Sequence, residues 1–213
     1  MIYTGWNDVD LSPEGMKEVL TIANRLKEEG VCFGIAFTSL LTRTIKTLEI
    51  VLNEYSCNNV EVVHSWELNE RHWGALQKVE MAKVRSMYGA EQIAQWRNDF
   101  YAKPPKQETT DLRSDGLGPS YKDIPYIPNG ESLHDLSLRV IPYLKSKIMP
   151  LVAKDENALV ISHRHVLRVI MRYLKNVSVD NMNMIDIEVG DVRIFTLNEL
   201  AEIVEEKEIK RVI

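Results

Sequence analysis

The sequence has few cysteines, no long hydrophobic run and no run of basic residues. Its two cysteines, Cys32 and Cys57, form neither a disulfide framework nor a metal-ligand spacing, so we expect a reduced, cytoplasmic setting. No apolar run is long enough to cross a bilayer and no signal peptide is recognised, so we expect no membrane partner. The net charge of −5, without a basic stripe, argues against a general nucleic-acid binder. A local group of Arg and His side chains could still attract an anionic substrate.

The chain has the length and composition of one soluble domain. Its 213 residues are enough for one sizeable core, and 45% hydrophobic with 27% charged residues is ordinary for a globular protein. Apolar periodicity and turn residues predict helices over 13–29, 40–55, 82–100, 132–151 and 166–174, and strands over 34–38, 60–63, 158–161 and 192–197. This alternation predicts an α/β three-layer sandwich, with a mainly parallel sheet flanked by helices.

Two helix starts and one irregular segment stand out. Ser12 followed by Pro13 is a favourable start, because the hydroxyl caps a free amide and proline needs no amide partner. Ser132, with Asp135 in the first turn, predicts a second capped helix. Most prolines and several glycines lie within 103–130, and such a long excursion is typical of a lid or binding loop.

The segment ISHRHVLR, residues 161–168, lies where a predicted buried strand gives way to a helix. In open α/β sheets that position faces the ligand crevice, and the free amides of a helix N-terminus favour anions there. Taken alone, His163 and His165 could equally be surface histidines on a connecting loop. No carboxylate or cysteine stands at a useful spacing from them, so we expect no metal site.

Two further stretches, YTGWNDVDLS at 3–12 and LNERHWG at 68–74, closely resemble the cofactor-dependent phosphoglycerate mutases of the histidine phosphatase superfamily. The resemblance covers almost the entire chain and is weak between 106 and 129. In that family a buried strand ending in Arg-His-Gly precedes the first stretch and lies beside the strand that ends at His163. The His of that strand carries the phosphoryl group. Only two residues precede the first stretch here, so we expect a truncated single domain over 1–213 that lacks the first strand and the nucleophile.

The resemblance assigns roles to residues at the matching positions. Glu70 would act as general acid/base at the substrate oxygen, because repulsion from a phosphate dianion raises the proton affinity of a nearby carboxylate. His163 would stabilise the phosphoryl group in flight, and Arg43 would neutralise it through planar, bidentate contact. The implied catalytic residues are thus Glu70 and His163. The implied substrate-binding residues are Thr4, Gly5, Arg43, Arg71, His72, Trp73, Arg97, Asn98, Arg164 and His165.

Two departures from the family lie in the strand-to-helix segment. Arg164 and His165 replace a Gly and an Asn of the family. Glycine allows a backbone to come close to a ligand, so Arg164 could crowd the phosphate site. It could instead point outward or replace a lost positive charge, and the sequence leaves these three outcomes open.

Other departures lie around the substrate. Asn98 stands where the family has the second of two arginines, so one charge is missing at the far end of the substrate. Trp73 replaces a Tyr and keeps an aromatic wall without the hydroxyl. The phosphate-binding Lys of the family aligns with Met81, and Lys78 or Lys83 could take its place only if the backbone shifts.

The resemblance implies a phosphoglycerate mutase of glycolysis and gluconeogenesis, which interconverts 2-phosphoglycerate and 3-phosphoglycerate by phosphoryl transfer. Its substrate would be a small phosphorylated three-carbon acid, its primer 2,3-bisphosphoglycerate, and it would need no metal. Because the family commonly forms dimers or tetramers, a homodimer or tetramer is implied. Covalent catalysis fails without its nucleophile, so the chain as written is expected to be inactive.

Three interpretations stay open. The recorded start could lie too late within a complete mutase, as the strong pocket motifs suggest. The chain could instead be a non-catalytic relative, a pseudoenzyme that binds phosphorylated or other anionic ligands or a partner protein. The changes at Arg164, His165, Asn98 and Met81 suggest this. A weak phosphatase that uses His163 or His165 is the third.

Overall fold

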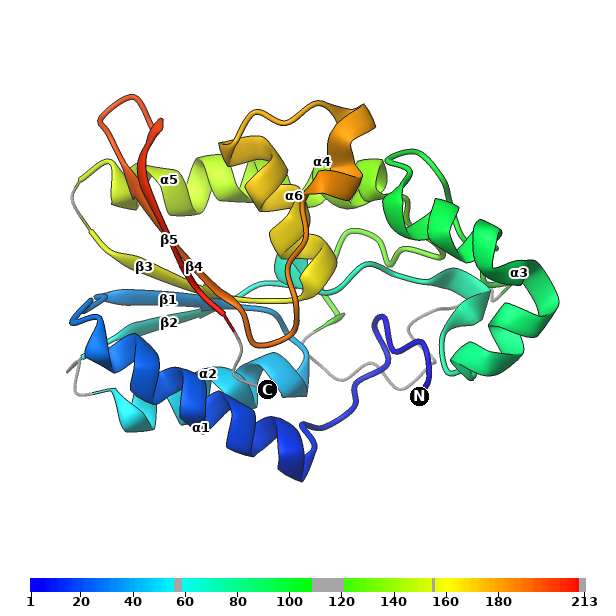
Figure 1. Ribbon diagram of the computed structural model, residues 1–213, viewed down its shortest axis with the longest axis horizontal. Coiled ribbons are helices and arrows are strands. Elements are labelled where there is room, and N and C mark those ends of the chain that lie inside the picture. Colours follow the sequence, from blue (N-terminus) through cyan, green and yellow to red (C-terminus); the bar gives the residue numbers. More distant parts are fainter. Residues whose placement is uncertain (56–58, 109–120, 155, 211–213) are drawn as a thin grey trace.

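A three-stranded parallel sheet forms the centre of the protein (Figure 1). The computed structural model describes residues 1–55, 59–108, 121–154 and 156–210. The strands, in the order β2-β1-β3, are β1 (Ile35–Thr38), β2 (Glu61–His64) and β3 (Ala158–Ile161). Their register places Thr38 beside His64 on one side and beside Ile161 on the other. The carboxyl ends of all three strands therefore meet at one edge of the sheet.

Helices cover both faces of this sheet (Figure 1). One face carries α1 (Pro13–Glu28) and α2 (Thr42–Glu54), and the other carries α4 (Leu133–Tyr143), α5 (Met149–Val152) and α6 (Arg164–Leu174). Successive side chains of β3 point to opposite faces of the sheet and therefore pack into the two hydrophobic cores that lie on those faces. Val160 packs on the side of α4 and α6, whereas Leu159 and Ile161 pack on the side of α1 and α2. The predicted α/β sandwich of three layers is confirmed.

The sheet is interrupted between β3 and the last two strands. β4 (Val192–Leu197) pairs antiparallel with β5 (Ile203–Ile209), and among the described residues neither strand pairs with the central sheet. Val192 and Ile194 nevertheless share the core that Leu159 and Ile161 of β3 enter. Within the described chain, β3 and β4 thus each keep one edge without a strand partner.

The sequence pattern did not predict β5. Its centre, residues 205–208, is a run of charged side chains that lie exposed on the hairpin. Lys175 of α6 lies 2.7 Å from Glu206, and Arg193 of β4 lies 2.5 Å from Glu208. Because ion pairs replace apolar packing along this strand, the alternation that indicates a strand is missing from the sequence.

The predicted helix starts are confirmed. The hydroxyl of Ser12 accepts from a first-turn amide of α1 at 3.0 Å, with Pro13 as the first helical residue. At the start of α4, the amide of Asp135 donates to the Ser132 hydroxyl at 3.0 Å, and the Ser132 amide donates to the Asp135 carboxylate at 2.8 Å. This reciprocal cap satisfies amides that the helix leaves free.

Two of the predicted helices contain interruptions. α3 (Met81–Asn98) bends at Gly89, which has a φ of 78°, as predicted. The predicted helix over 132–151 is not continuous, because a π-helical turn (Leu144–Ile148) separates α4 from α5. Pro142 has no amide to donate in the last turn of α4, which favours a change of helix type there. Short 3₁₀ turns are η1 (Trp66–Leu68), η2 (Gly74–Leu76) and η6 (Val179–Met184).

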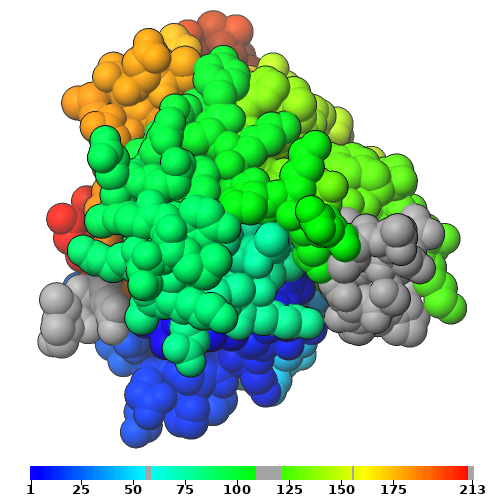
Figure 2. Space-filling view, turned by 90° about the vertical axis from the view of Figure 1, so that its right-hand side faces the viewer, coloured from blue at the N-terminus to red at the C-terminus, as the bar shows by residue number. Residues whose placement is uncertain are grey.

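The first residues of the chain lie against the segment that leads into α3. The Tyr3 amide donates to Val79 at 3.0 Å, and the Lys78 amide donates to Tyr3 at 2.8 Å. Figure 2 shows the face that α3 covers (green), with the N-terminal residues (dark blue) below it. Of the predicted excursion over 103–130, residues 109–120 lie outside the described residues. No helix of the described residues is long and apolar enough to cross a membrane.

Candidate active site

Side chains from three distant segments meet at the carboxyl edge of the sheet. Arg43 lies in the first turn of α2 after β1, Glu70 lies in the irregular segment after β2, and His163 follows β3. The charges of Arg43 and Glu70 both act on the pKa of His163, so the three groups lie within short electrostatic range. The N-termini of α2 and α6 lie at the same edge, where anions are favoured, and the first amide of α2 donates to the Asp8 carboxylate at 2.7 Å.

His163 is buried and held by hydroxyl groups. Its Nε2 lies 2.9 Å from the Ser39 hydroxyl, which in turn lies 2.6 Å from the Thr44 hydroxyl. Burial, and next to it the charge of Arg43, lowers the pKa of His163 to about 3. The imidazole is therefore neutral at physiological pH. Sequence reasoning missed Ser39, whose only signal is its place directly after a buried strand.

The Glu70 carboxylate is ionised. Its Oε1 accepts from the Arg71 amide at 2.7 Å and lies 3.3 Å from Nδ1 of His165. Burial alone would raise the pKa of Glu70, but the neighbouring imidazoles of His165 and His163 and the amide of Arg71 together hold it well below the usual range. The sequence argument expected a raised proton affinity for this carboxylate. Repulsion by a phosphate would have to overcome these neighbours.

Arg43 is held at the site by backbone carbonyl groups. Its guanidinium donates to the carbonyl oxygens of Gly5 at 2.8 Å and Asn7 at 3.2 Å. Burial lowers the pKa of Arg43, while the charges of Glu70 and Asp8 raise it. The arginine stays charged, because even a lowered arginine pKa lies far above neutrality. A fixed cation therefore faces the Glu70 carboxylate.

Gly5 and Thr4 shape the turn that orients Arg43. Gly5 has a φ of 51°, and a Cβ there would meet the side-chain oxygen of Gln77 at 2.1 Å. That oxygen accepts from the Trp6 amide at 2.7 Å. Thr4 accepts from the Asn7 amide at 2.8 Å and is half-buried. In the structure these two residues build the turn, and direct substrate contact by them stays a prediction.

Arg71 holds the loop around Glu70 through hydrogen bonds to backbone carbonyl groups. It is fully buried, and its guanidinium donates to the carbonyl oxygens of Glu131 at 2.5 Å, Ala102 at 3.0 Å and Trp96. Its guanidinium also stacks 4.5 Å from the ring centroid of Trp73. All three nitrogen atoms therefore donate to protein carbonyls, and a phosphate contact by Arg71 stays a prediction.

A buried ion pair that the sequence argument missed clamps the same loop. Arg139 of α4 lies 2.8 Å from Glu131, and their side chains are 2% and 3% exposed. Arg139 also donates to the carbonyl oxygens of Asn69 at 2.9 Å and Glu70 at 3.0 Å, and Glu131 accepts from the His72 amide at 2.7 Å. The pair fixes the backbone on both sides of Glu70. Its only sequence signal is a charged residue beside the apolar positions of an amphipathic helix.

The residues expected at the far end of the substrate lie at the end of α3. Arg97 is exposed, with its guanidinium 6.0 Å from the ring centroid of Tyr3. Asn98 is also exposed, and its side-chain oxygen accepts from Arg168 at 3.4 Å. Arg168 is buried and donates to backbone carbonyls of the segment after α6. His72 is buried, and its Nδ1 accepts from the Gly74 amide at 3.0 Å.

Arg164 points to a pair of carboxylates. Its guanidinium lies 2.6 Å from Asp186 and 3.3 Å from Glu188, and its side chain is 40% exposed. Of the three outcomes that the sequence left open, the structure has the outward orientation. His165, one residue later, is buried beside Glu70 with its ring 5.4 Å from that of Trp73.

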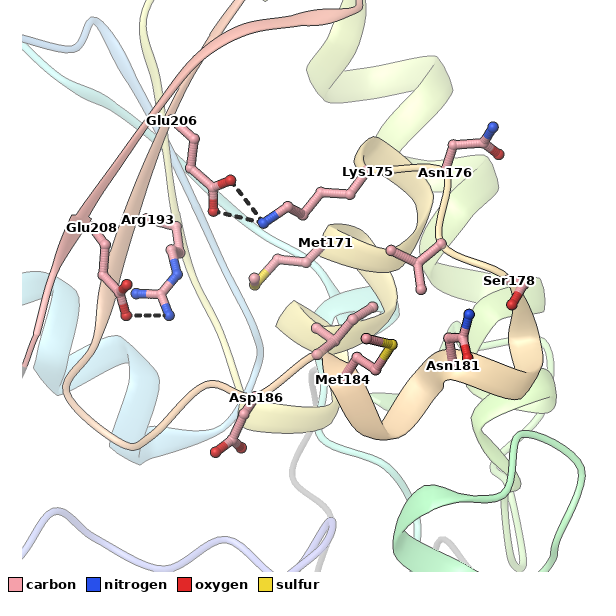
Figure 3. A pocket seen from close by; sticks show the side chains of 12 residues that line it. Met171, Lys175, Asn176, Ser178, Asn181, Met184, Asp186, Arg193, Glu206 and Glu208 are labelled. Carbon is pink, nitrogen blue, oxygen red and sulfur yellow. Dashed lines mark hydrogen bonds and ion pairs between the residues drawn. The ribbon is translucent and has the colours of Figure 1, made fainter.

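A second hollow lies away from these residues, between α6 and the β4–β5 hairpin. It has a volume of about 490 Å³, and Figure 3 shows Lys175 and Arg193 reaching toward Glu206 and Glu208 inside it. Its charged side chains are engaged in ion pairs, Lys175 with Glu206, Arg193 with Glu208, and Asp186 with Arg164 outside the hollow. Among the described residues, no group of three or more His, Cys, Asp or Glu side chains could hold a metal ion.

Comparison with solved structures finds proteins of the same fold. The chain is similar in structure to a mycobacterial glucosyl-3-phosphoglycerate phosphatase, with a TM-score of 0.62 and 19% identity over 87% of this chain and 78% of that chain. It is similar to an alpha-ribazole phosphatase from Shigella flexneri, with a TM-score of 0.63 and 21% identity over 93% of this chain and 83% of the other. It also resembles Bacillus stearothermophilus YhfR, with a TM-score of 0.65 and 21% identity over 92% and 82%.

These structural likenesses concern the fold, since each is below 25% identity. The sequence itself matches one family over residues 1–114 and 118–208, which is nearly its full length. Together with the parallel sheet and the group of Arg43, Glu70 and His163 at its carboxyl edge, this match shows the family. The chain belongs to the histidine phosphatase superfamily, branch 1.

Proposed function

We propose that the carboxyl edge of the sheet is a phosphomonoester site and that its chemistry is of the phosphatase type, the transfer of a phosphoryl group to water. The observation that carries this proposal is the grouping of Arg43, Glu70 and His163 at the N-termini of two helices. Fixed cations and helix amides of this kind neutralise the equatorial oxygens of a transferring phosphoryl group without a metal.

Each of the three side chains has a distinct role in the proposed site. Arg43 binds the phosphate oxygens, because its charge is held in place by two carbonyl groups. His163, neutral and fixed by Ser39, offers one hydrogen bond to the phosphoryl group. Glu70 exchanges a proton with the ester oxygen and with the attacking water.

The attacking imidazole is implied by the resemblance and is not among the three side chains grouped at the site. The resemblance implies a histidine on a strand beside β3, and the open edges of β3 and β4 support a place for one extended segment. Binding and turnover are then separable properties. The residues described here bind a phosphomonoester, and turnover requires that segment.

Two observations favour a phosphatase over a mutase. Two of the structural neighbours are named as phosphatases. A mutase primed by 2,3-bisphosphoglycerate also needs a second anion site, and here Arg97 is a single exposed cation while Asn98 is bonded to Arg168. These residues do not fit a bisphosphate well, so we derive no step through that primer.

A second candidate is a protein that binds phosphomonoesters without turning them over. The departures from the family at Arg164, His165 and Asn98 favour it, with Arg164 paired to Asp186 and Glu188. This candidate keeps the same anion site and differs only in the chemical step.

One experiment tests the proposal and separates the two candidates. An apolar strand ending in Arg-His-Gly is fused ahead of Met1, and hydrolysis of p-nitrophenyl phosphate and acid-labile phosphohistidine are measured. The control fusion carries Asn in place of that His. We expect turnover and phosphohistidine from the first fusion alone. Vanadate binding without turnover would favour the non-catalytic candidate, and no binding of vanadate by either fusion would overturn the site itself.

A further inference from the structure

His165 lies in direct contact with the carboxylate that the proposed chemistry uses. It occupies the first turn of α6, and its Nδ1 lies 3.3 Å from Oε1 of Glu70. The side chains of His165 and Glu70 are only 11% and 13% exposed. Trp73 packs against the imidazole in a T-shaped arrangement, with 5.4 Å between the ring centroids. The imidazole is therefore confined to one small, largely dry space with Glu70.

The other charged groups around His165 are cations. Burial has the largest influence on the pKa of His165 and lowers it, and the charges of Arg71 and Arg168 lower it further, so the net shift is downward. The charge of Glu70, whose Oε1 lies 3.3 Å from Nδ1, is the influence that raises it, without outweighing burial. His163 lies close by, but its Nε2 is committed to Ser39. Glu70 is thus the group that favours a proton on His165.

The chemistry requires a proton that Glu70 alone does not hold. Protonation of a leaving alkoxide needs an acid, yet the Glu70 carboxylate is ionised, and its amide contact with Arg71 favours that form. A proton must therefore reach Glu70 from a neighbour or with the substrate. His165 is the titratable group in contact with Oε1.

We propose that His165 is the positioning residue and proton store of Glu70, so that the two side chains hold one shared proton during phosphoryl transfer. This inference rests on the function proposed above. The dianionic ester favours protonation of the pair when it binds, because like charge disfavours a bare carboxylate beside it.

The proton then follows a closed path. When the ester P–O bond breaks, its electron pair stays on the alcohol oxygen, which takes a proton from Glu70 while His165 Nδ1 replaces that proton. Phosphorus meanwhile bonds to the strand-borne imidazole named above. When water later displaces that imidazole, the proton of the water passes through Glu70 back to His165. Ester and water give alcohol and phosphate, and the pair ends with the same proton that it held at the start.

The first test needs neither ligand nor turnover. Histidine side-chain NMR titrations compare the 213-residue chain with Glu70→Gln, using the signal of the exposed His64 as the reference. The proposal expects Glu70→Gln to lower the pKa of His165 by about one unit, a tenfold loss of proton affinity. An unchanged His165 titration in a folded Glu70→Gln protein would overturn it.

The second test measures the affinity for sulfate between about pH 5 and 8. Sulfate mimics a phosphate group, and it stays a dianion over this range. Proton uptake by the pair predicts that sulfate affinity rises up to about tenfold for each unit by which pH falls. His165→Asn should lose this dependence and keep its affinity at high pH, and His165→Gln should behave alike. An identical pH dependence in the variants would overturn the role of His165. If sulfate binds none of the proteins, the proposed anion site fails, while the first test still decides the coupling.

Discussion

The buried arginines of this protein fall into two groups that the sequence does not distinguish. Arg71, Arg139 and Arg168 donate from every side-chain nitrogen to backbone carbonyls or protein side chains, and each is at most 5% exposed. Arg43 is partly exposed and is held by two carbonyls. Arg71, Arg139 and Arg168 therefore fix loops, whereas Arg43 places a positive charge at the site. The hydrogen-bond partners of an arginine, more than its position in a motif, therefore indicate what it does.

The largest effect should come from breaking the first group. Arg139→Met leaves the Glu131 carboxylate buried without its cation and releases the loop carbonyls next to Glu70. Losing one partner of a buried pair costs about 3–5 kcal/mol. Thermal unfolding should therefore show a melting temperature lowered by about 10 °C.

A matched double variant separates charge from packing in this result. Arg139→Met combined with Glu131→Gln removes both charges and keeps an oxygen for the His72 amide, so it should unfold at a higher temperature than Arg139→Met alone. A single variant that melts like the wild-type protein would show that this pair does not hold the loop.

Arg43→Gln should have the next largest effect, on binding and not on folding. Removing a charged donor from an anion site weakens phosphate or vanadate binding by about 10- to 100-fold. The melting temperature should change far less than in Arg139→Met, because only two partly accessible carbonyls lose a donor. Isothermal titration measures the affinity. Equal affinities for wild type and variant would remove Arg43 from the site.

The low pKa of His163 predicts a specific dependence of stability on pH. The unfolded histidine binds a proton near its ordinary pKa of 6.5, whereas the folded one does so only near 3. Between these values the unfolded state holds the extra proton, so stability falls as pH falls. The free energy of unfolding by urea should drop by up to about 1.4 kcal/mol more per pH unit in the wild type than in His163→Asn. Parallel curves for the two proteins would contradict burial of a neutral His163.

The smallest effect should come from Arg164→Gln. Its ion pairs with Asp186 and Glu188 lie at the surface, where such pairs contribute about 0–1 kcal/mol. Phosphate affinity should stay close to that of the wild type. A loss as large as that of Arg43→Gln would mean that Arg164 replaces a missing phosphate ligand, against the orientation seen here.

Local sequence signals predicted most of the fold. The Ser12 and Ser132 caps, the break at Gly89 and the apolar run of β3 each depend on neighbours within a few residues. The charged strand β5 was missed because its partners, Lys175 and Arg193, lie far away in the sequence.

The site was predictable only through its motif positions. These positions brought Arg43, Glu70 and His163 together, yet they also suggested a phosphate contact for Arg71. The loop carbonyls that bind Arg71 belong to residues 25 to 60 positions away, so no local pattern reveals them. The same holds for Glu131 and Arg139, which no motif includes.

The location of a bound anion tests the central claim most directly. Crystals of the 213-residue chain grown with inorganic phosphate should show a phosphate whose oxygens contact the Arg43 guanidinium and the His163 imidazole, with the Glu70 carboxylate beside it. A phosphate that instead contacts Arg97 or Arg164, or a site that stays empty at saturating phosphate, would contradict the account.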